Sequence, residues 1–489
     1  MKSDIKKGLK CISIVFLLLN SFLVLGQIKT SKQPNIVFIL TDQWRGQALG
    51  FLGKEKVKTP QLDALAKESL VLTQMVTNYP VCSPARAMIF SGTYPAKSKV
   101  YCNVNSGSAP YGVELPTDIV CWSDILKQQG YSNGYIGKWH LDAPHRPYVP
   151  TKNNEGDLAW NEWTPFNRRH GFDYWYAYNT YDYHNRPMYW DNKATRNELH
   201  FVDQWGPIHE ADKAIDFINN KGNVRNPNAP FSFVVSINPP HEPYDTAPAK
   251  YHEPYNNIPL DSLLKDTNIP AAGTPKGDEY RKNVKDYYAN ITGVDEQIGR
   301  IVNELKEKRL LENTIIMITA DHGNCLGKHN EHSKNNIYEE SLRIPFIVYW
   351  KGHIKPGIDT KFLGSLQDVY PTLLDLAGMS KQIPVTVDGV SYANYFLNRK
   401  GNKPTEQFIM GALGYKGFDS GFRGIRTSEY KLAYQKEGNK VVPYLFNLKN
   451  DPFEMNNIYT KDNPIVKKMY PRLQYWLKKT NDGFIVSSM

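Results

Sequence analysis

The sequence predicts an α/β protein built around one large, mostly parallel sheet with helices on both faces. Short apolar runs rich in β-branched residues alternate with helical patterns along most of the chain. Four of these runs are followed directly by polar or charged residues. The chain has 489 residues, 41% of them hydrophobic and 22% charged, which is enough for a globular protein with a large core.

The predicted strands are Asn35–Leu40, Tyr131–Ile136, Phe231–Ile237, Thr314–Thr319 and Pro345–Tyr349. The predicted helices are Gln61–Ser69, Ser123–Gln129, Glu210–Asn219, Lys282–Lys308, Tyr370–Ala377 and Pro464–Lys479. Thr59-Pro60 is a typical helix start, with threonine as the N-cap and proline at the first helical position. Beyond Gly378, glycine and proline interrupt the pattern, which predicts a small C-terminal subdomain over residues 379–489, with antiparallel strands and a final helix.

Residues 1–26 have the pattern of a secretory signal peptide. Four lysines precede the apolar run Cys11–Leu25, and small residues suit cleavage before Gln27. The run is short for a membrane span, so we expect a periplasmic or secreted protein; an uncleaved anchor is the alternative. Cleavage would remove four lysines and one aspartate and lower the formal charge from +10 to +7. That basic balance is compatible with acidic substrates.

The mature chain would keep four cysteines: Cys82, Cys102, Cys121 and Cys325. So few cysteines exclude a disulfide scaffold. If Cys82 is modified, an odd number remains and at most one disulfide can form, whose partners the sequence does not identify.

Side chains with metal-binding or acid–base chemistry follow four of the predicted strands. They are Asp42 and Gln43, then Lys138 and His140, then His241, and finally Asp321 and His322. Because ligands of open α/β sheets bind beyond the carboxyl ends of the strands, we expect these residues to gather in one site. Carboxylate and amide oxygens favour calcium or magnesium over zinc, and His322 is the discordant ligand.

Cys82-Ser83-Pro84-Ala85-Arg86 places a thiol, a proline and an arginine within five residues. Arg86 lies about one helical turn from Cys82, so its charge can reach whatever Cys82 holds or attacks. Pro84 suits the first turn of a helix, which directs N–H groups and a positive dipole end at Cys82. The stretch predicts an activated cysteine in an anion-binding cradle; an ordinary cysteine near a turn is the alternative.

This Cys-x-Pro-x-Arg pattern resembles the signature of the sulfatase family, the formylglycine-dependent type I sulfatases of the alkaline phosphatase superfamily. Further segments that resemble the family are Ser91–Pro95, Gly137–His140, Pro239–Pro243, Leu366–Gly378 and Tyr444–Asn457. The resemblance covers about Asn35 to Asn457. It implies an alkaline-phosphatase-like fold, with a large mixed sheet flanked by helices, a catalytic domain over residues 27–378 and a smaller C-terminal antiparallel sheet.

In that family the motif cysteine is oxidised to formylglycine, an aldehyde whose hydrate is the nucleophile, so the resemblance implies this role for Cys82. A formylglycine-generating or anaerobic sulfatase-maturing enzyme would be the partner. The resemblance also implies a divalent cation, calcium with magnesium as the alternative, held by Asp42, Gln43, Cys82, Asp321 and His322. The family more often has two aspartates in the first loop; Asp42-Gln43 resembles the branch of choline sulfatases and phosphonate monoester hydrolases.

By the same resemblance, three cations neutralise the sulfuryl oxygens: Arg86, Lys138 and Lys334. His241, or Lys334 beside it, protonates the departing alcohol. His140 takes a proton from the second hydroxyl of the hydrate, which expels sulfate and restores the aldehyde.

Residues 142–208 are rich in aromatic side chains and poor in regular periodicity, which predicts a substrate-binding insert. Within it, His184 and Arg186 are candidates to contact an acid or hydroxyl group of a sugar. The features together resemble secreted bacterial sulfatases of polysaccharide degradation; ulvan is the first candidate substrate, with carrageenan and glycosaminoglycan fragments as alternatives. We expect no nucleic-acid partner and no stable membrane span.

Two other functions remain open from the sequence. One is a phosphodiesterase or phosphonate monoester hydrolase of the same superfamily, since a metal and an arginine also stabilise phosphoryl transfer. The other is a non-catalytic protein that binds sulfated glycans, in which Cys82 stays a thiol.

Overall fold

A computed structural model, which describes residues 33–415, 419–438 and 440–484, confirms the predicted α/β class. Its main sheet has eight strands in the order β10-β2-β9-β8-β1-β7-β3-β4. Strand β9 is antiparallel to both of its neighbours, whereas the other pairs are parallel, so the sheet is mixed as expected. The predicted signal peptide, residues 1–26, lies outside the described residues.

The strands of the main sheet are β1 (Asn35–Thr41), β2 (Leu70–Leu72), β3 (Ser132–Lys138), β4 (Tyr174–Tyr178), β7 (Phe231–Ile237), β8 (Thr314–Ala320), β9 (Phe346–Tyr349) and β10 (Gly357–Asp359). A short ribbon consists of β5 (Met188–Tyr189) and β6 (His200–Phe201). The α-helices are α2 (Pro60–Ala66), α3 (Cys82–Ser91), α4 (Pro95–Ser98), α5 (Trp122–Gln128), α6 (Gly206–Ile218), α7 (Ala249–Asn256), α8 (Pro275–Glu307), α9 (Glu339–Leu342), α10 (Val369–Leu376), α11 (Ala393–Asn398) and α12 (Pro464–Lys479).

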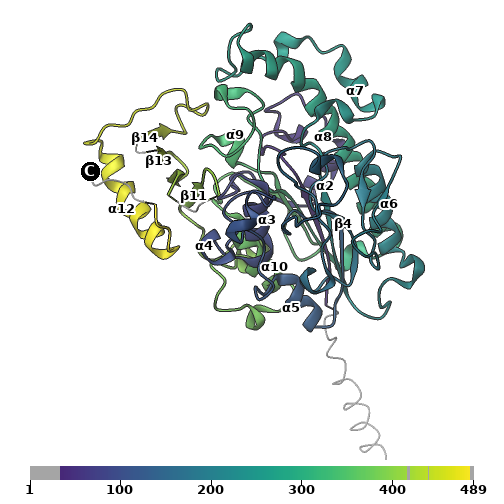
Figure 1. Cartoon of the computed structure of the whole chain (residues 1–489). Helices are drawn as coiled ribbons and strands as arrows, with labels where there is room; N and C mark the ends of the chain where they lie inside the picture. Colours follow the sequence, from purple (N-terminus) through teal and green to yellow (C-terminus); the bar gives the residue numbers. More distant parts are fainter. Residues whose placement is uncertain (1–32, 416–418, 439, 485–489) are drawn as a thin grey trace, which may run out of the picture.

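Helices cover both faces of the main sheet (Figure 1). On one face α2 and α6 pack against the long helix α8, and α6 also contacts β3 and β7. On the other face α3, α5 and α10 contact one another, and α5 contacts β3. Strands β1, β7 and β8 have seven residues each, and all of these residues are buried, as expected for central parallel strands covered on both sides.

Several elements differ from the sequence-based expectation at their ends. Helix α8 begins at Pro275, seven residues before Lys282, because the Thr274 hydroxyl accepts a hydrogen bond from Gly277 N–H. The predicted cap Thr59 instead bonds Asp63 through its hydroxyl. The first N–H groups of α2 donate to the carboxylate of Asp295 on α8, a cap from a distant part of the sequence.

Three strands of the main sheet were not predicted. Strands β2 and β10 have three residues each, too few to show a period of two. Strand β4 lies within residues 142–208 and pairs in parallel with β3, so part of this aromatic segment extends the sheet at its edge. Many of its rings are therefore core side chains; Trp175, Trp190 and Trp205 are buried.

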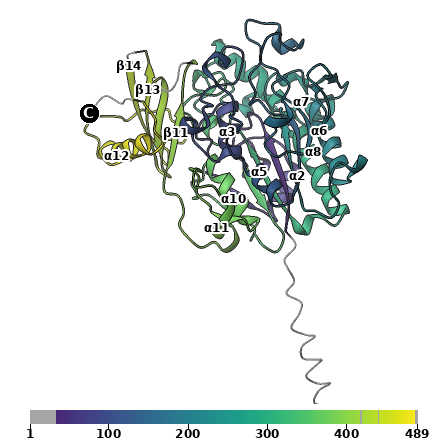
Figure 2. The same ribbon diagram turned by 60° about the horizontal axis from the view of Figure 1, so that its bottom comes forward.

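The predicted C-terminal antiparallel sheet is present and lies beside the main body (Figure 2). It is a meander of β11 (Gln407–Gly411), β12 (Gly421–Arg426), β13 (Tyr430–Glu437) and β14 (Lys440–Asn447). Helix α12 packs on it through a stripe of buried residues at helical spacing: Val466, Met469, Leu473 and Leu477. None of the described helices combines the length and apolar character that a bilayer span requires.

A buried ion cluster joins the C-terminal sheet to the main body. Glu339, at the start of α9, accepts two hydrogen bonds from Arg426 on β12. Lys431 on β13 lies 2.9 Å from Glu339 and 2.6 Å from Glu454, and it also donates to a backbone carbonyl. Lys431 is fully buried, so both carboxylates share one buried cation as their partner.

We predict that Lys431→Met lowers the free energy of unfolding by about 3–5 kcal/mol, because both buried carboxylates lose a shared cation. Urea unfolding followed by tryptophan fluorescence measures the loss. The matched control is Lys436→Met on the same strand, whose partner Asp419 lies at the surface; it should cost less than about 1 kcal/mol. Equal losses in both variants would contradict the prediction.

Candidate active site and metal centre

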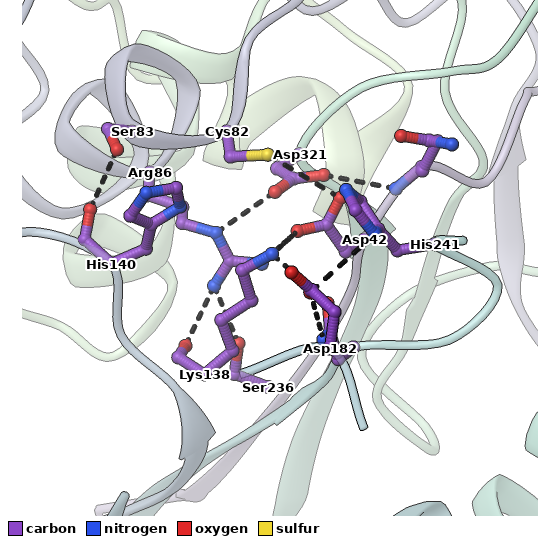
Figure 3. Close-up of polar contacts among 12 residues, drawn as sticks. Asp42, Cys82, Ser83, Arg86, Lys138, His140, Asp182, Ser236, His241 and Asp321 are labelled. Atoms are coloured by element: carbon purple, nitrogen blue, oxygen red, sulfur yellow. Dashed lines mark hydrogen bonds and ion pairs between the residues drawn. The ribbon is translucent and has the colours of Figure 1, made fainter. Parts of the chain in front are cut away.

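The carboxyl ends of β1, β3, β7 and β8 meet the N-terminus of α3 at one edge of the main sheet (Figure 3). Thr41 pairs in parallel register with Ala320, so the residues that follow them, Asp42 and Asp321, lie side by side. Both carboxylates are fully buried. Two acids in this arrangement require positive charge nearby, and the surrounding residues supply it.

Arg86 bridges the two acids (Figure 3). Its Nε lies 2.9 Å from Asp321 Oδ2, and its Nη2 lies 3.2 Å from Asp42 Oδ2. Its Nη1 donates to the carbonyl of Lys138 and to the hydroxyl of Ser236. The guanidinium therefore fixes the ends of four strands, β1, β3, β7 and β8, one helical turn from Cys82 as the sequence suggested.

Two lysines complete the positive charge. Lys138 Nζ lies 2.7 Å from Asp42 Oδ2 and 3.0 Å from Asn238 Oδ1. Lys334 Nζ lies 3.1 Å from Cys82 Sγ and 3.0 Å from Gln43 Oε1. These charges, with that of His241, hold the pKa of Asp42 well below its usual range although burial opposes them.

The Gly-Lys-Trp-His segment has a clear steric reason for its glycine. Gly137 has a φ of +95°, and a Cβ there would lie 2.2 Å from the carbonyl oxygen of Ser236. A side chain at this position would push β3 away from β7 and displace Lys138. His140, three residues later, also has a positive φ of 60°, a strained conformation that is common at functional sites.

Cys82 is the first residue of α3, and its Sγ lies among these charges. Burial and Asp42 oppose ionisation of the thiol, but Lys334, Lys138 and His322 together bring its pKa well below the usual range. The N-terminal end of α3 adds a positive dipole end. Position 82 is therefore suited to a group that carries or develops negative charge.

The atoms around Cys82 also fit a metal ion. Asp42 Oδ1 lies 3.3 Å from His322 Nε2 and 3.7 Å from Cys82 Sγ, and His322 Nε2 lies 3.2 Å from Sγ and 3.6 Å from Asp321 Oδ1. Ligands about 90° apart around a calcium ion are about 3.3–3.7 Å from each other. All four donor atoms lie within 4.8 Å of one another.

The donor set is oriented by its neighbours. His322 Nδ1 lies 2.9 Å from the carbonyl of Gly323 and donates its hydrogen there. Nearby negative charges raise the pKa of His322 to about 9 although burial opposes them, so a bound metal would have to displace the proton on Nε2 to use its lone pair. Gln43 turns its amide Nε2 to Glu242 and Tyr244, which leaves Oε1 facing Lys334. Gln43 is thus beside the cluster, with its oxygen on the same side as Cys82.

In each of the two predicted acid–base histidines, one ring nitrogen lies within hydrogen-bond distance of a backbone carbonyl and the other is left for a further partner. His140 is buried, with Nε2 3.2 Å from the carbonyl of Val104, and Nδ1 has no hydrogen-bond partner among the described residues. Burial lowers the pKa of His140, which favours the neutral imidazole. His241 Nδ1 lies 2.8 Å from the carbonyl of Glu242 and 3.7 Å from Asp182, which leaves Nε2 for another partner.

The two predicted substrate-binding residues lie outside the cluster around Cys82. His184 is buried behind His241, with Nε2 3.1 Å from the His241 carbonyl, and burial lowers the pKa of His184 to about 4. A neutral imidazole there supports the loop that carries His241. Arg186 is exposed and forms an ion pair of 3.0 Å with Asp203.

The structure adds three residues that the sequence did not single out. Asn238 and Glu242 flank His241, within or near the Pro239–Pro243 segment, and their position just past β7 could have indicated them. Asp182 lies far away in the sequence, in the aromatic segment, and accepts a hydrogen bond from Asn238. No pattern around Asp182 indicates this contact.

Comparisons with known proteins agree with the fold and the site. A family model described as sulfatase matches residues 34–379, and one described as N-sulphoglucosamine sulphohydrolase, C-terminal, matches residues 327–481. An endo-4-O-sulfatase of Bacteroides thetaiotaomicron is 35% identical, covering 92% of this chain and 93% of the relative. An ulvan-active sulfatase of Formosa agariphila is 32% identical, covering 94% and 88%.

Among solved structures, a Bacteroides fragilis protein described as the sulfatase yidJ has a TM-score of 0.89 and 48% identity, covering 94% of this chain and 98% of that one. The fold and the buried acids and cations define a hydrolase of the alkaline-phosphatase-like class. The chain belongs to the sulfatase family. It is a sulfuric ester hydrolase, as the Cys82 motif indicated.

A buried acid lies beneath this site. Glu210 on α6 is fully buried and accepts a hydrogen bond of 3.2 Å from the Tyr189 hydroxyl. Its Oε2 has no partner among the described residues. Burial raises the pKa of Glu210 from about 4.5 to about 8, so the folded protein holds a proton here that the unfolded chain releases.

We predict that this proton makes stability depend on pH. Between about pH 4.5 and 8 the unfolded state gains charge at Glu210 that the folded state resists, so wild-type stability falls as pH rises. Glu210→Gln removes this effect and should gain stability over wild type by up to about 1.4 kcal/mol per pH unit within the window. Urea unfolding at pH 5 and pH 8 measures the free energy of unfolding of the variant and of wild type. Glu253→Gln, at an exposed position, is the control. If Glu210→Gln differs from wild type by the same free energy at both pH values, the prediction is wrong.

Proposed function

We propose that the protein hydrolyses sulfate esters on a sulfated polysaccharide or on its oligosaccharides. The observation that carries this proposal is the convergence of three cations, Arg86, Lys138 and Lys334, on Cys82 and its paired acids. A sulfate ester is negatively charged, and more charge develops on the leaving oxygen. Buried cations in place before the reaction stabilise that charge more than water does.

Cys82 is the residue that becomes formylglycine in this proposal, through a formylglycine-generating or anaerobic sulfatase-maturing enzyme. As its hydrate, the aldehyde supplies one hydroxyl that attacks sulfur and a second whose deprotonation releases sulfate. The low pKa of the Cys82 thiol supports the assignment, because the same surroundings favour an ionised oxygen at this position.

Asp42, Asp321, His322 and residue 82 would hold a divalent cation, with Gln43 Oε1 beside them. The cation supplies a Lewis acid that neutralises sulfuryl oxygen and lowers the pKa of the bound hydroxyl. The predominance of oxygen donors favours calcium, with magnesium as the alternative.

The remaining residues bind the sulfuryl group or move protons. Lys138 and Lys334 bind sulfuryl oxygens. Arg86, expected from the sequence to neutralise these oxygens as well, is engaged by both acids, so it adds its positive charge from beneath them and keeps the acids in register. His140 accepts the proton of the second hydroxyl at Nδ1, the nitrogen without a partner. His241 donates a proton to the leaving alcohol from Nε2; Lys334 is the alternative donor.

The substrate class follows from the relatives and from the predicted signal peptide. Ulvan is the first polysaccharide to test, because one relative is an ulvan-active sulfatase. Glycosaminoglycan fragments come next, because another relative is an endo-4-O-sulfatase. We place the enzyme in the periplasm or outside the cell, where such polymers are degraded. Arg186 contacts the sugar, and His184 positions the loop of His241.

The test is sulfate release by the purified protein from oligosaccharides of ulvan, 4-O-sulfated glycosaminoglycans and carrageenan, beside aryl sulfate and aryl phosphate. We expect release from at least one sugar, and faster hydrolysis of aryl sulfate than of phosphate; the reverse preference would support a phosphonate or phosphodiester hydrolase. In the mass of the peptide with Cys82, oxygen should replace sulfur and two hydrogens. An intact thiol with binding but no turnover would indicate a glycan-binding protein.

We predict that His241→Gln discriminates between leaving groups. A sugar alkoxide is a poor leaving group and needs a proton, so kcat/KM for a sulfated sugar should fall about 10²–10⁴-fold. Nitrophenolate leaves without protonation, and its sulfate should lose far less activity. His252→Gln on α7, whose ring bonds the Ala247 carbonyl, is the control. An equal loss on both substrates would exclude His241 as the proton donor.

A further inference from the structure

A group of side chains from residues 142–208, all exposed except the half-buried Trp160, borders the site, and we call it the aromatic rim. It consists of Lys152, Trp160, Tyr183, Arg186 and Phe201. Tyr183 is 43% exposed and Phe201 36%, unlike most rings of this segment. Exposed rings of this size beside a catalytic centre are candidate binding surfaces.

The rings and cations of the aromatic rim lie against one another. The Tyr183 ring is 5.2 Å from that of Tyr181, which is 6.0 Å from the ring of Phe201. Lys152 Nζ lies 4.7 Å from the centre of the Tyr183 ring, and the Arg186 guanidinium lies 4.7 Å from that of Phe201. Each exposed ring is therefore accompanied by a positive charge.

The aromatic rim is continuous with the site at both acid–base histidines. Asp182, directly before Tyr183, lies 3.7 Å from His241 Nδ1 and accepts hydrogen bonds from Asn238 and Asn153. Asn153 follows Lys152, so Lys152 is tied to the same acid. At the other end the Trp160 ring lies 6.2 Å from the ring of His140.

We propose that the aromatic rim binds the sugar next to the sulfated one, and that this neighbouring sugar is anionic. The inference rests on the proposed function. In sulfate ester hydrolysis the leaving group is the sugar itself, so the carbohydrate lies on the side of the proton donor His241. There the chain would meet Tyr183 and Phe201, whose faces pack against the apolar C–H face of a sugar.

The charge of the neighbouring sugar follows from Lys152 and Arg186. Both cations are exposed beside the rings, and the one carboxylate that pairs with Arg186 in the described part of the chain is Asp203, itself an exposed residue. An exposed ion pair contributes little to stability, so Arg186 can exchange its partner for a carboxylate or sulfate of the substrate at small cost. A neutral glycan would not use these charges.

The test compares Tyr183→Ala/Arg186→Gln with a matched control, Tyr475→Ala/Arg472→Gln. The control pair is an exposed tyrosine under an arginine that forms an ion pair with Glu406, in the C-terminal subdomain. The measured quantity is kcat/KM for tetrasaccharides of ulvan and of a 4-O-sulfated glycosaminoglycan, which contain carboxylates, and of carrageenan, which contains sulfates alone. Nitrophenyl sulfate is the reference substrate without a neighbouring sugar.

For the tetrasaccharide that is turned over, the rim variant should lose roughly 10–100-fold in kcat/KM through KM, and lose less at high salt. In the control variant, kcat/KM for the tetrasaccharide should not fall relative to kcat/KM for nitrophenyl sulfate. A loss on the uronate-containing chains alone identifies a carboxylate as the ligand, and a loss on carrageenan identifies a sulfate. Unchanged KM, or an equal loss on nitrophenyl sulfate, would overturn the proposal.

If no tetrasaccharide releases sulfate, the proposed function fails, and the aromatic rim is tested by binding instead. Calorimetric titration of the same three tetrasaccharides into wild type and the rim variant gives Kd. A rise of roughly tenfold or more in Kd for the variant supports an anionic-sugar site. Equal Kd values, or no binding to wild type, overturn it.

Discussion

The contact on which the site depends is the bridge of Arg86 between Asp42 and Asp321. Parallel register between β1 and β8 forces these two carboxylates together in a fully buried position, an arrangement that is unfavourable unless a cation lies within reach. Arg86 supplies it from the first turns of α3, and this places Cys82 at the start of the same helix. The pairing of the acids and the position of the proposed nucleophile are thus one constraint.

That constraint also explains the distribution of the other charges. Lys138 adds a second cation at Asp42 Oδ2, the oxygen that Arg86 also contacts, and Lys334 faces Cys82 from a different loop. The positive charge that the two acids do not neutralise faces the position beside Cys82 where a sulfuryl group would bind. Burial and the neighbouring cations lower the pKa of His140, so its imidazole is neutral and can accept a proton, as our proposal requires.

Much of this arrangement could be predicted from the sequence because it depends on strand ends. Buried strands have a strong apolar signal, and polar residues after them lie at one edge in any parallel sheet. Asp42, Lys138, His241 and Asp321 were found in this way. Asp182 could not be, since it is brought in by β4, an edge strand hidden in an aromatic segment. Asp295, which caps α2 through contacts that span 233 and 234 residues of the sequence, is likewise a partner that no local pattern reveals.

The parts of the site that could be predicted and those that could not have different roles in our proposal. The reacting centre is built by central strands, where burial and register leave little freedom. Recognition of the sugar in our proposal falls to residues 142–208, which contribute core rings to the sheet edge and exposed rings to the aromatic rim. Core packing holds the segment against β3, so Tyr183 and Phe201 can be exposed on a rigid support. Changes in the exposed rings can therefore alter the preferred glycan without disturbing the charges around Cys82.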